Sequence, residues 1–163
     1  MLTYISEMKS LPFFEICQVY QQSIEHSAQA LSGARSEGLW QEEQELYQEL
    51  RDLFEKRNGV LALWRTEQGI QAALRLEKYN EGLLLQSLET RPENRRKGFA
   101  LSLVSAVLAD QPRNTILYSH IKKDNIASMQ LHLRCGFQAH SDMARLLDGT
   151  VTNQFITLKY VKE

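Results

Sequence analysis

Apolar residues in the first third of the chain recur every three or four positions, which is the repeat of an amphipathic helix. After a short apolar stretch at 2–5, read as a first strand, such a stripe predicts one helix over 13–31. Glycine follows a polar residue in Ser32-Gly33 and in Glu37-Gly38, and both dipeptides indicate a loop. A second helix is predicted over 41–56, where the leucine residues share one face.

From Val60 onward the pattern changes to the alternation of a strand. It predicts strands over 60–66 and 70–79 joined by a hairpin turn at 67–69, and a third, mostly apolar strand over 83–88. Because the connections between these strands are short, they predict an antiparallel meander.

The third strand runs into a tight turn and then a helix. Pro92 ends the strand, since proline lacks the N–H that a sheet ladder requires. Beyond Gly98 the apolar spacing becomes helical as far as Asp110, and a further strand is predicted over 115–121. A strand–helix–strand unit of this length favours a parallel pair with a right-handed crossover.

The remaining pattern predicts a helix over 126–134 and a closing hairpin formed by strands over 137–147 and 152–160. No repeat or linker indicates a second domain. The prediction is therefore a single α/β domain over residues 1–163, with a mixed sheet.

The turn between the third strand and its helix combines three features that suit an anion. The helix N-terminus offers unpaired N–H groups and a positive dipole end, Gly98 allows close approach, and Arg95, Arg96 and Lys97 add charge. The sequence therefore predicts a phosphate site, with an ordinary solvated basic turn as the alternative. The ligand of such a unit lies outside the carboxyl ends of the strands, which is where this turn lies.

Composition narrows the class of protein. A chain of 163 residues with a formal net charge of −1 is typical of a globular domain without general affinity for nucleic acid. Its two cysteines, Cys17 and Cys135, form neither a disulfide framework nor a metal-ligand pattern. No apolar run reaches membrane-spanning length and no signal-peptide pattern is present, so we expect a cytoplasmic protein that does not act at a membrane.

The order of elements and two motifs resemble the GNAT superfamily of N-acetyltransferases. The first motif is Arg95-x-x-Gly98-x-Ala100, which is similar to the family's pyrophosphate loop. The second is Asn125-x-x-Ser128-x-x-x-His132-x-x-x-Gly136-Phe137, which is similar to the family's Asn-x-x-Ala-x-x-x-Tyr-x-x-x-Gly-Phe segment. The resemblance covers nearly the whole chain and implies a GNAT fold, a twisted mixed sheet of about seven strands flanked by four helices.

The resemblance also implies the co-substrate and the chemistry. Acetyl-coenzyme A would bind with its pantetheine arm between two strands that splay apart, and a neutral amine would attack the thioester directly. No cysteine nucleophile and no metal is needed, and Cys135 is read as a structural thiol. The residues implied for coenzyme A are Leu88, Thr90, Arg95, Arg96, Lys97, Gly98, Phe99, Ala100, Asn125 and Ser128.

Two histidines are the candidate catalytic residues, and both depart from the family pattern. His132 stands where many members have a tyrosine that protonates the leaving thiolate. His120 matches the position of a glutamate base in members that acetylate protein N-termini. Arg96 replaces a glycine common in the phosphate loop, and the backbone cradle should tolerate this change.

The acceptor and the alternatives stay open at this stage. The acceptor would be a small-molecule amine, a peptide or protein N-terminus, or a lysine, and a homodimer is one option for the assembly. Four carboxylates on the second helix either attract a cationic amine or form a solvated face: Glu42, Glu43, Glu45 and Glu49. The alternatives are a coenzyme A-binding regulatory or degenerate domain and, disfavoured by the lack of a basic face, a nucleic-acid-binding protein.

Overall fold

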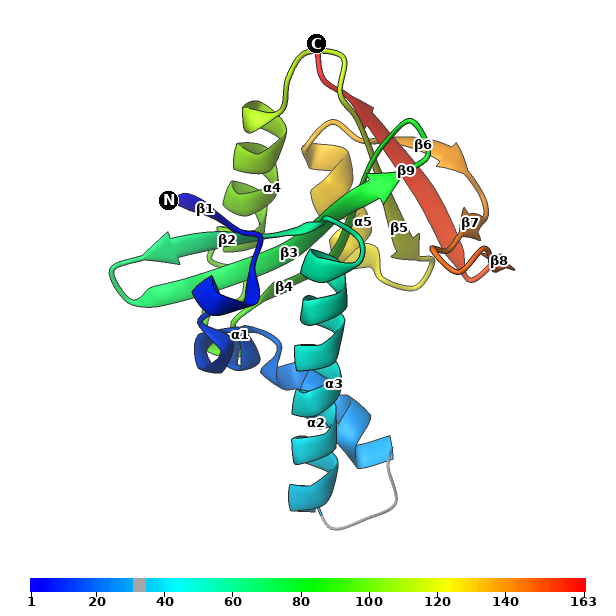
Figure 1. The fold of residues 1–163 in the computed structure, drawn as a ribbon. Helices are drawn as coiled ribbons and strands as arrows, with labels where there is room; N and C mark the ends of the chain where they lie inside the picture. The colour runs from blue at the N-terminus through cyan, green and yellow to red at the C-terminus, as the bar shows by residue number, and fades with distance from the viewer. Residues whose placement is uncertain (31–34) are drawn as a thin grey trace.

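A seven-stranded mixed sheet forms the centre of the molecule, which we describe from a computed structural model covering residues 1–30 and 35–163 (Figure 1). Its spatial order is β1-β2-β3-β4-β5-β9-β6. The strands are β1 (Leu2–Ile5), β2 (Val60–Thr66), β3 (Gly69–Tyr79), β4 (Gly82–Thr90), β5 (Ile116–Lys122), β6 (Gln138–Ser141) and β9 (Phe155–Val161). The predicted fold class, including the seven strands, is confirmed.

Strand pairing follows the predicted meander and the predicted parallel unit. β2, β3 and β4 pair in antiparallel order, and β4 pairs with β5 in parallel. The helix between the two parallel strands, α4 (Phe99–Asp110), supplies the crossover. The observed strands differ from the predicted ranges by no more than two residues at each end in this region.

Helices cover both faces of the sheet, so two apolar cores form (Figure 1). α1 (Phe13–Val19), α2 (Gln21–Ala30) and α3 (Arg35–Glu55) lie on one face, and α4 and α5 (Ile126–Arg134) lie on the other. Leu50, Leu53, Leu61 and Leu63 are fully buried in the first core, and Leu103, Val104 and Leu117 in the second. Two short 3₁₀ helices, Met8–Ser10 and Pro92–Asn94, complete the set.

The first predicted helix is divided in two, which corrects the helix count of the described chain from four to five α-helices. α1 ends before Tyr20, and α2 starts directly after it. Tyr20 is 4% exposed, and its hydroxyl donates a hydrogen bond of 2.7 Å to the carbonyl oxygen of Ser87. The periodicity could not reveal the break, because the apolar residues of both pieces belong to the same core. The predicted end of this helix at Leu31 lies outside the described residues.

The loop predicted at Glu37-Gly38 is wrong, because both residues belong to α3. A Cβ atom at Gly38 would lie 2.9 Å from the carbonyl oxygen of Ala28 in α2. The glycine therefore permits close contact of two antiparallel helices rather than ending one. The other loop signal, Ser32-Gly33, lies outside the described residues.

The closing hairpin is more broken than predicted. β6 pairs with β9, and a separate two-stranded ladder joins β7 (Ala144–Arg145) to β8 (Val151–Thr152). The chain turns between β6 and β7, where the hydroxyl of Ser141 accepts a bond from the amide of Met143. Local side-chain bonds of this kind compete with a continuous ladder.

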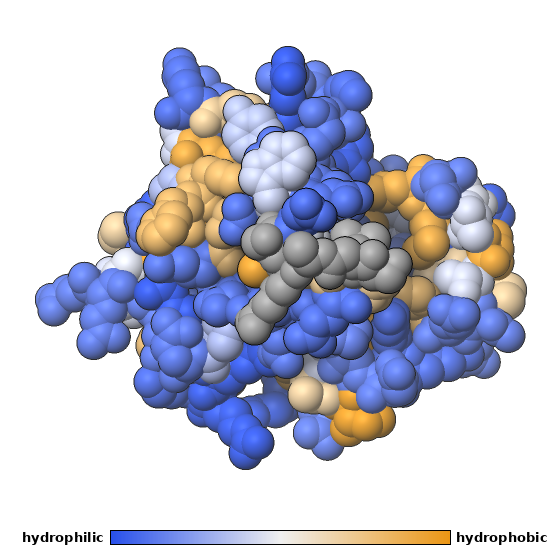
Figure 2. Space-filling model, turned by 90° about the horizontal axis from the view of Figure 1, so that it is seen from below, coloured by the Kyte–Doolittle hydropathy of each residue, from blue (hydrophilic) through white to orange (hydrophobic). Residues whose placement is uncertain are grey.

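The surface is mainly hydrophilic in the view from below, with separate hydrophobic patches (Figure 2). The most exposed aromatic side chains of the described residues are Phe14 and Trp40, at 75% and 65%. Across the described ranges, no helix combines the length and the apolar character that crossing a bilayer requires.

Candidate functional site

A bulge in β4 marks the centre of the site. Ala73 pairs with Glu89 and Arg75 pairs with Gln86, so two residues of β4 stand opposite one residue of β3. Within the bulge Ser87 has a φ of 52°, in the left-handed region. The bond from Tyr20 to the Ser87 carbonyl anchors this irregular backbone to the junction between α1 and α2.

β4 and β5 separate soon after they begin. They pair only at Leu83 with Leu117 and at Leu84 with Tyr118. From Leu85 onward one edge of β4 carries backbone groups that do not bond to β5, and a cavity of about 180 Å³ lies between the two strands. An extended amide-bearing chain can pair with such an edge, so the splay that the resemblance implied is present.

The basic turn presents backbone donors at the start of α4. Gly98 has a φ of 85° and Arg96 a φ of 61°, so both adopt the left-handed conformation. The first amide of α4 with a helical partner is that of Ser102, which donates to the Gly98 carbonyl at 2.9 Å. The amides before it have no partner within the helix and point out of its positive end.

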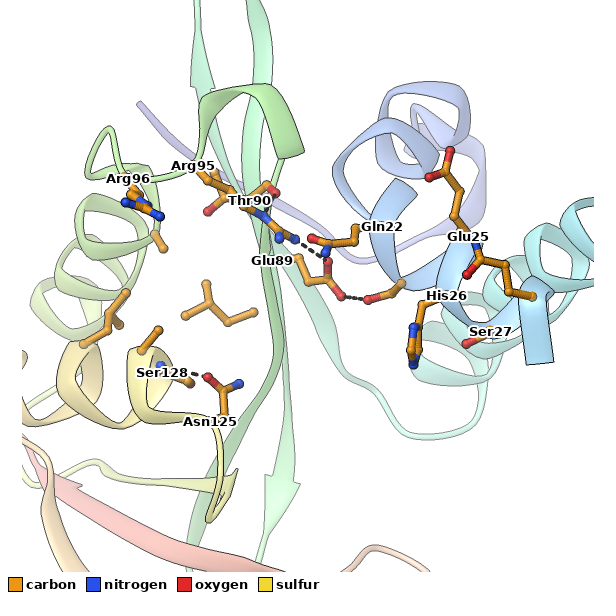
Figure 3. A pocket seen from close by; sticks show the side chains of 16 residues that line it. Gln22, Glu25, His26, Ser27, Glu89, Thr90, Arg95, Arg96, Asn125 and Ser128 are labelled. Carbon is orange, nitrogen blue, oxygen red and sulfur yellow. Dashed lines mark hydrogen bonds and ion pairs between the residues drawn. The ribbon is translucent and has the colours of Figure 1, made fainter.

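A cavity of about 960 Å³ lies between α2 on one side and β4, α4 and α5 on the other (Figure 3). Arg95 and Arg96 lie at its α4 end, while Asn125 and Ser128 lie on α5 (Figure 3). Asn125 caps α5, since its side-chain oxygen accepts a bond of 3.1 Å from the amide of Ser128. The large cavity therefore extends from the basic turn to the strand cavity, with which it shares Leu88, Asn125 and Ser128.

The structure brings most of the predicted coenzyme A residues together. Those that line the large cavity are Leu88, Thr90, Arg95, Arg96, Ala100, Asn125 and Ser128. Lys97, Gly98 and Phe99 do not line it. The Nζ of Lys97 donates to Asn94 at 2.6 Å, Phe99 packs against the second core, and Gly98 contributes backbone only.

His132 is held in a defined tautomer. Its Nδ1 lies 2.8 Å from the carbonyl oxygen of Ser128, which can only accept, so Nδ1 carries the hydrogen. Nε2 then accepts from the hydroxyl of Ser119 at 3.1 Å. The ring is 1% exposed, and this burial lowers its pKa, partly opposed by the bond to Ser128. The side chain is a neutral imidazole near pH 7, at the wall of the strand cavity.

His120 lines the same cavity from β5. The hydroxyl of Thr157 donates to the Met143 carbonyl, so it accepts from Nδ1 of His120 at 3.0 Å. Nε2 is buried without a hydrogen-bond partner among the described residues, and burial lowers the pKa of the ring, partly opposed by the backbone of Arg145. A neutral imidazole with a free nitrogen has the chemistry of a base.

Sequence reasoning missed the α2 side of the cavity and Glu89. Ser23 of α2 donates to the Glu89 carboxylate, and Arg95 lies 3.7 Å from it (Figure 3). Burial raises the pKa of Glu89, partly opposed by Ser23 and Arg95. No signal in the sequence could have found these residues, because the apolar stripe of α2 marks only its buried face.

A third cavity, of about 280 Å³, lies between α2 and α3 and meets the large cavity at Ser23, Ser27 and Glu89. Of the four carboxylates singled out on α3, three line it, and Glu43 does not. Glu49 is held by Arg75, with 2.6 Å between Oε2 and the guanidinium. The acidic face of α3 therefore borders the site rather than facing solvent alone.

The two thiols are poor nucleophiles. Burial raises the pKa of Cys17 to about 11 and also raises that of Cys135, whose thiol contacts Ser105. Neither lines the cavities described above. Their positions support the expected structural role of Cys135.

Comparisons with known proteins agree with this geometry. A family model described as "FR47-like protein" matches residues 53–146, more than half of the chain. No curated protein matches its sequence.

Among solved structures, PaiA N-acetyltransferase from Thermoplasma acidophilum, in complex with coenzyme A, has a TM-score of 0.64 at 9% identity and covers 99% of each chain. The ribosomal-protein-S18-alanine N-acetyltransferase from Escherichia coli has a TM-score of 0.59 at 16% identity, covering 100% of this chain and 95% of that one. A chimera of spermidine N-acetyltransferase SpeG from Vibrio cholerae and hSSAT has a TM-score of 0.61 at 16% identity, with 99% and 95% covered. At these identities the likeness concerns the fold alone.

Proposed function

Because this chain belongs to the GNAT acetyltransferase superfamily through its FR47-like domain, we propose that it moves an acetyl group from acetyl-coenzyme A to a primary amine. The observation that carries the proposal is that the large cavity at the basic turn and the strand cavity at the splay adjoin, sharing Leu88, Asn125 and Ser128 in their walls. A long ligand with phosphates at one end and an amide-bearing arm at the other fits this arrangement.

The chain's own residues would hold the co-substrate in three places. The amides of residues 96–101 and the two arginine side chains at the α4 end would bind the pyrophosphate. The free edge of β4 at Leu88 and Thr90 would pair with the pantetheine arm. An amide of the same edge would donate to the thioester oxygen and stabilise negative charge that develops there.

The reaction would be a direct transfer. The amine nitrogen forms a bond to the carbonyl carbon, the carbon–sulfur bond breaks, and the electron pair stays on sulfur. One proton leaves the amine, and one is gained by the thiolate. We propose His120 as the acceptor of the first proton and His132 as the donor of the second, each directly or through water.

The acceptor would enter from the side of α3. Relatives of similar fold include enzymes named for spermidine and for a ribosomal protein alanine. In this chain Glu42, Glu45 and Glu49 border the cavity that reaches the bulge. A small amine, a peptide or protein N-terminus, and a lysine side chain all carry the positive charge that such a border attracts.

One observation favours a second candidate, a domain that binds coenzyme A without turnover. His132 carries its hydrogen toward Ser128 and is buried as the neutral ring. To donate a proton from Nε2, it must first become an imidazolium ion. Acetyl transfer to a panel of amines and peptides separates the two candidates: the enzyme consumes acetyl-coenzyme A with at least one acceptor, and the binding domain with none.

The binding step itself is tested by two matched glycine variants. Gly98 and Gly149 both have positive φ, and at both positions a Cβ atom meets nothing within 4 Å. Gly98→Glu places bulk and negative charge in the phosphate cradle, so we expect coenzyme A binding to be lost in calorimetry. Gly149→Glu places the same group in the β7–β8 turn, so it should bind like the wild type. Normal binding by Gly98→Glu would contradict the proposal.

A further inference from the structure

Three polar side chains that do not line the large cavity tie the basic turn to β3. Gln71 of β3 donates from Nε2 to Thr66 Oγ1 at 3.1 Å and to the Gly69 carbonyl at 3.2 Å. Its Oε1 accepts from Asn94 Nδ2 at 2.5 Å. Oδ1 of Asn94 then accepts from Lys97 Nζ at 2.6 Å. The three side chains form one continuous relay of hydrogen bonds from the sheet to the residue before Gly98.

The burial of this relay needs an explanation. Gln71 is fully buried and Asn94 is 9% exposed. Burying an amide costs free energy unless all its groups are paired, and an apolar residue of similar size would avoid that cost. Both amides are paired here, and neither side chain lines the large cavity. Their contribution is therefore to the conformation of the turn.

The turn needs such support. Arg96 is a non-glycine residue with a φ of 61°, and it lies between Asn94 and Lys97, the two ends of the last bond of the relay. A left-handed conformation is strained for a residue that carries a side chain. The bond from Lys97 to Asn94 closes the chain around Arg95 and Arg96, and the amide of Arg91 adds a bond of 2.9 Å to the Gln71 carbonyl. These contacts oppose relaxation of the strained backbone.

We propose that Gln71 is a positioning residue for phosphate binding: through Asn94 and Lys97 it sets the amides of the basic turn before the ligand arrives. The ligand is the pyrophosphate group of coenzyme A, so the inference rests on the proposed function. The charged side chains of the turn have different roles. Arg95 and Arg96 face the cavity, whereas Lys97 bonds to Asn94 within the turn. Pre-formed donors bind an anion more tightly, because ordering them costs nothing at the moment of binding.

The test uses Gln71→Leu, Asn94→Leu and the double variant, with coenzyme A as the probe in calorimetry. Each single variant should weaken binding about tenfold to a hundredfold, which corresponds to the loss of one or two buried hydrogen bonds. Both side chains act through the same chain of hydrogen bonds, so the effects of the two substitutions should not add. The dissociation constant of the double variant for coenzyme A should stay within about twofold of that of the weaker-binding single variant. Asn94 lies in the short 3₁₀ helix Pro92–Asn94, outside the sheet, so its variant keeps the test usable should Gln71→Leu not fold.

A purely structural role predicts a different result. In that case the apo melting temperature of each variant falls while the dissociation constant for coenzyme A stays within twofold of the wild type, and the inference is wrong. Fully additive losses in the double variant would also overturn it. Gln111→Leu, at the far end of α4, is the matched control and should bind normally. A wild-type protein that does not bind coenzyme A would overturn the proposed function and this inference together, whereas variant failure alone leaves the proposed function standing.

Discussion

At the scale of single residues, the surroundings of His132 decide what its ring can do. The Ser128 carbonyl fixes the hydrogen on Nδ1, and the Ser119 hydroxyl occupies Nε2. Nε2, the nitrogen from which His132 would donate a proton, therefore carries no hydrogen in the resting state. Activity through His132 then requires protonation of a ring whose pKa burial has lowered.

Substitution of His132 tests this role directly. If the ring supplies the proton, His132→Phe lowers kcat by about a hundredfold or more while coenzyme A affinity is kept. His132→Tyr should keep substantial activity, since a phenol also donates a proton. Steady-state kinetics with an acceptor from the amine panel provide the measurement. An unchanged kcat in His132→Phe would show that positioning and water suffice.

The same residue predicts a pH dependence of stability. The folded-state pKa of His132 lies below the unfolded value of about 6.5, so the unfolded chain binds more protons as the pH falls through that value. The free energy of unfolding should be fully retained above pH 6.5 and should decline below it. Urea unfolding at pH 7.5, 6.5 and 5.5 should show a shallower decline in His132→Phe. Some decline remains, because the pKa of His120 is shifted in the same direction. Equal slopes in the two proteins would rule out the contribution of His132.

At the scale of elements, α3 closes the side of the site from which we propose that the acceptor enters. Its apolar face packs in the first core, and its acidic face borders the cavity that ends at the β4 bulge. Glu45 lines this cavity, while Glu43, two positions earlier on the same helix, does not. Substituting lysine at either position makes the same change of charge, once at the wall of this cavity and once away from it.

Charge reversal on α3 should therefore depend on position. Glu45→Lys should raise KM for a cationic acceptor at low salt and leave the dissociation constant of coenzyme A unchanged, because the repulsion acts only on the acceptor. Glu43→Lys serves as the control and should change KM much less. The difference should shrink as ionic strength rises. Equal effects of both variants would show that α3 acts only through the net charge of the protein.

At the scale of the whole molecule, the large cavity joins the two layers of helices. α2 belongs to the first core, and α4 and α5 belong to the second. A ligand in this cavity would contact both sides of the sheet, so it should stabilise the molecule as one unit rather than one layer of it.

Ligand binding should accordingly raise the melting temperature of the intact protein. Coenzyme A at a hundredfold excess over its dissociation constant adds about 2.7 kcal/mol to the free energy of unfolding. For a domain of this size that corresponds to a shift of roughly 5–10 °C. Differential scanning calorimetry should show a single transition that moves as a whole. An unchanged melting temperature at saturating acetyl-coenzyme A would contradict the proposed function.

The sequence by itself determined the elements whose signals are local. α5 begins and ends at the predicted residues, and β2 does as well, because caps, turn residues and apolar periodicity act within a few positions. The strand–turn–helix structure of the basic turn was also predictable, since a strand end, a glycine and the start of a helix are consecutive in the chain. Seven of the ten residues expected around coenzyme A line one cavity: five belong to this strand end, turn and helix start, and the other two, Asn125 and Ser128, were named from the resemblance.

Only the tertiary structure decided what depends on contacts between distant segments. The break at Tyr20 follows from its bond to Ser87, and Gly38 lies inside a helix because α2 passes close to it. Lys97 bonds to Asn94, which is itself held by Gln71 from 23 positions away. Glu89 and the α2 side of the cavity had no signal in periodicity, which records the buried face of an element and not what its other face meets. The partners of these residues lie up to 67 positions away, and a local pattern carries no information about contacts at that separation.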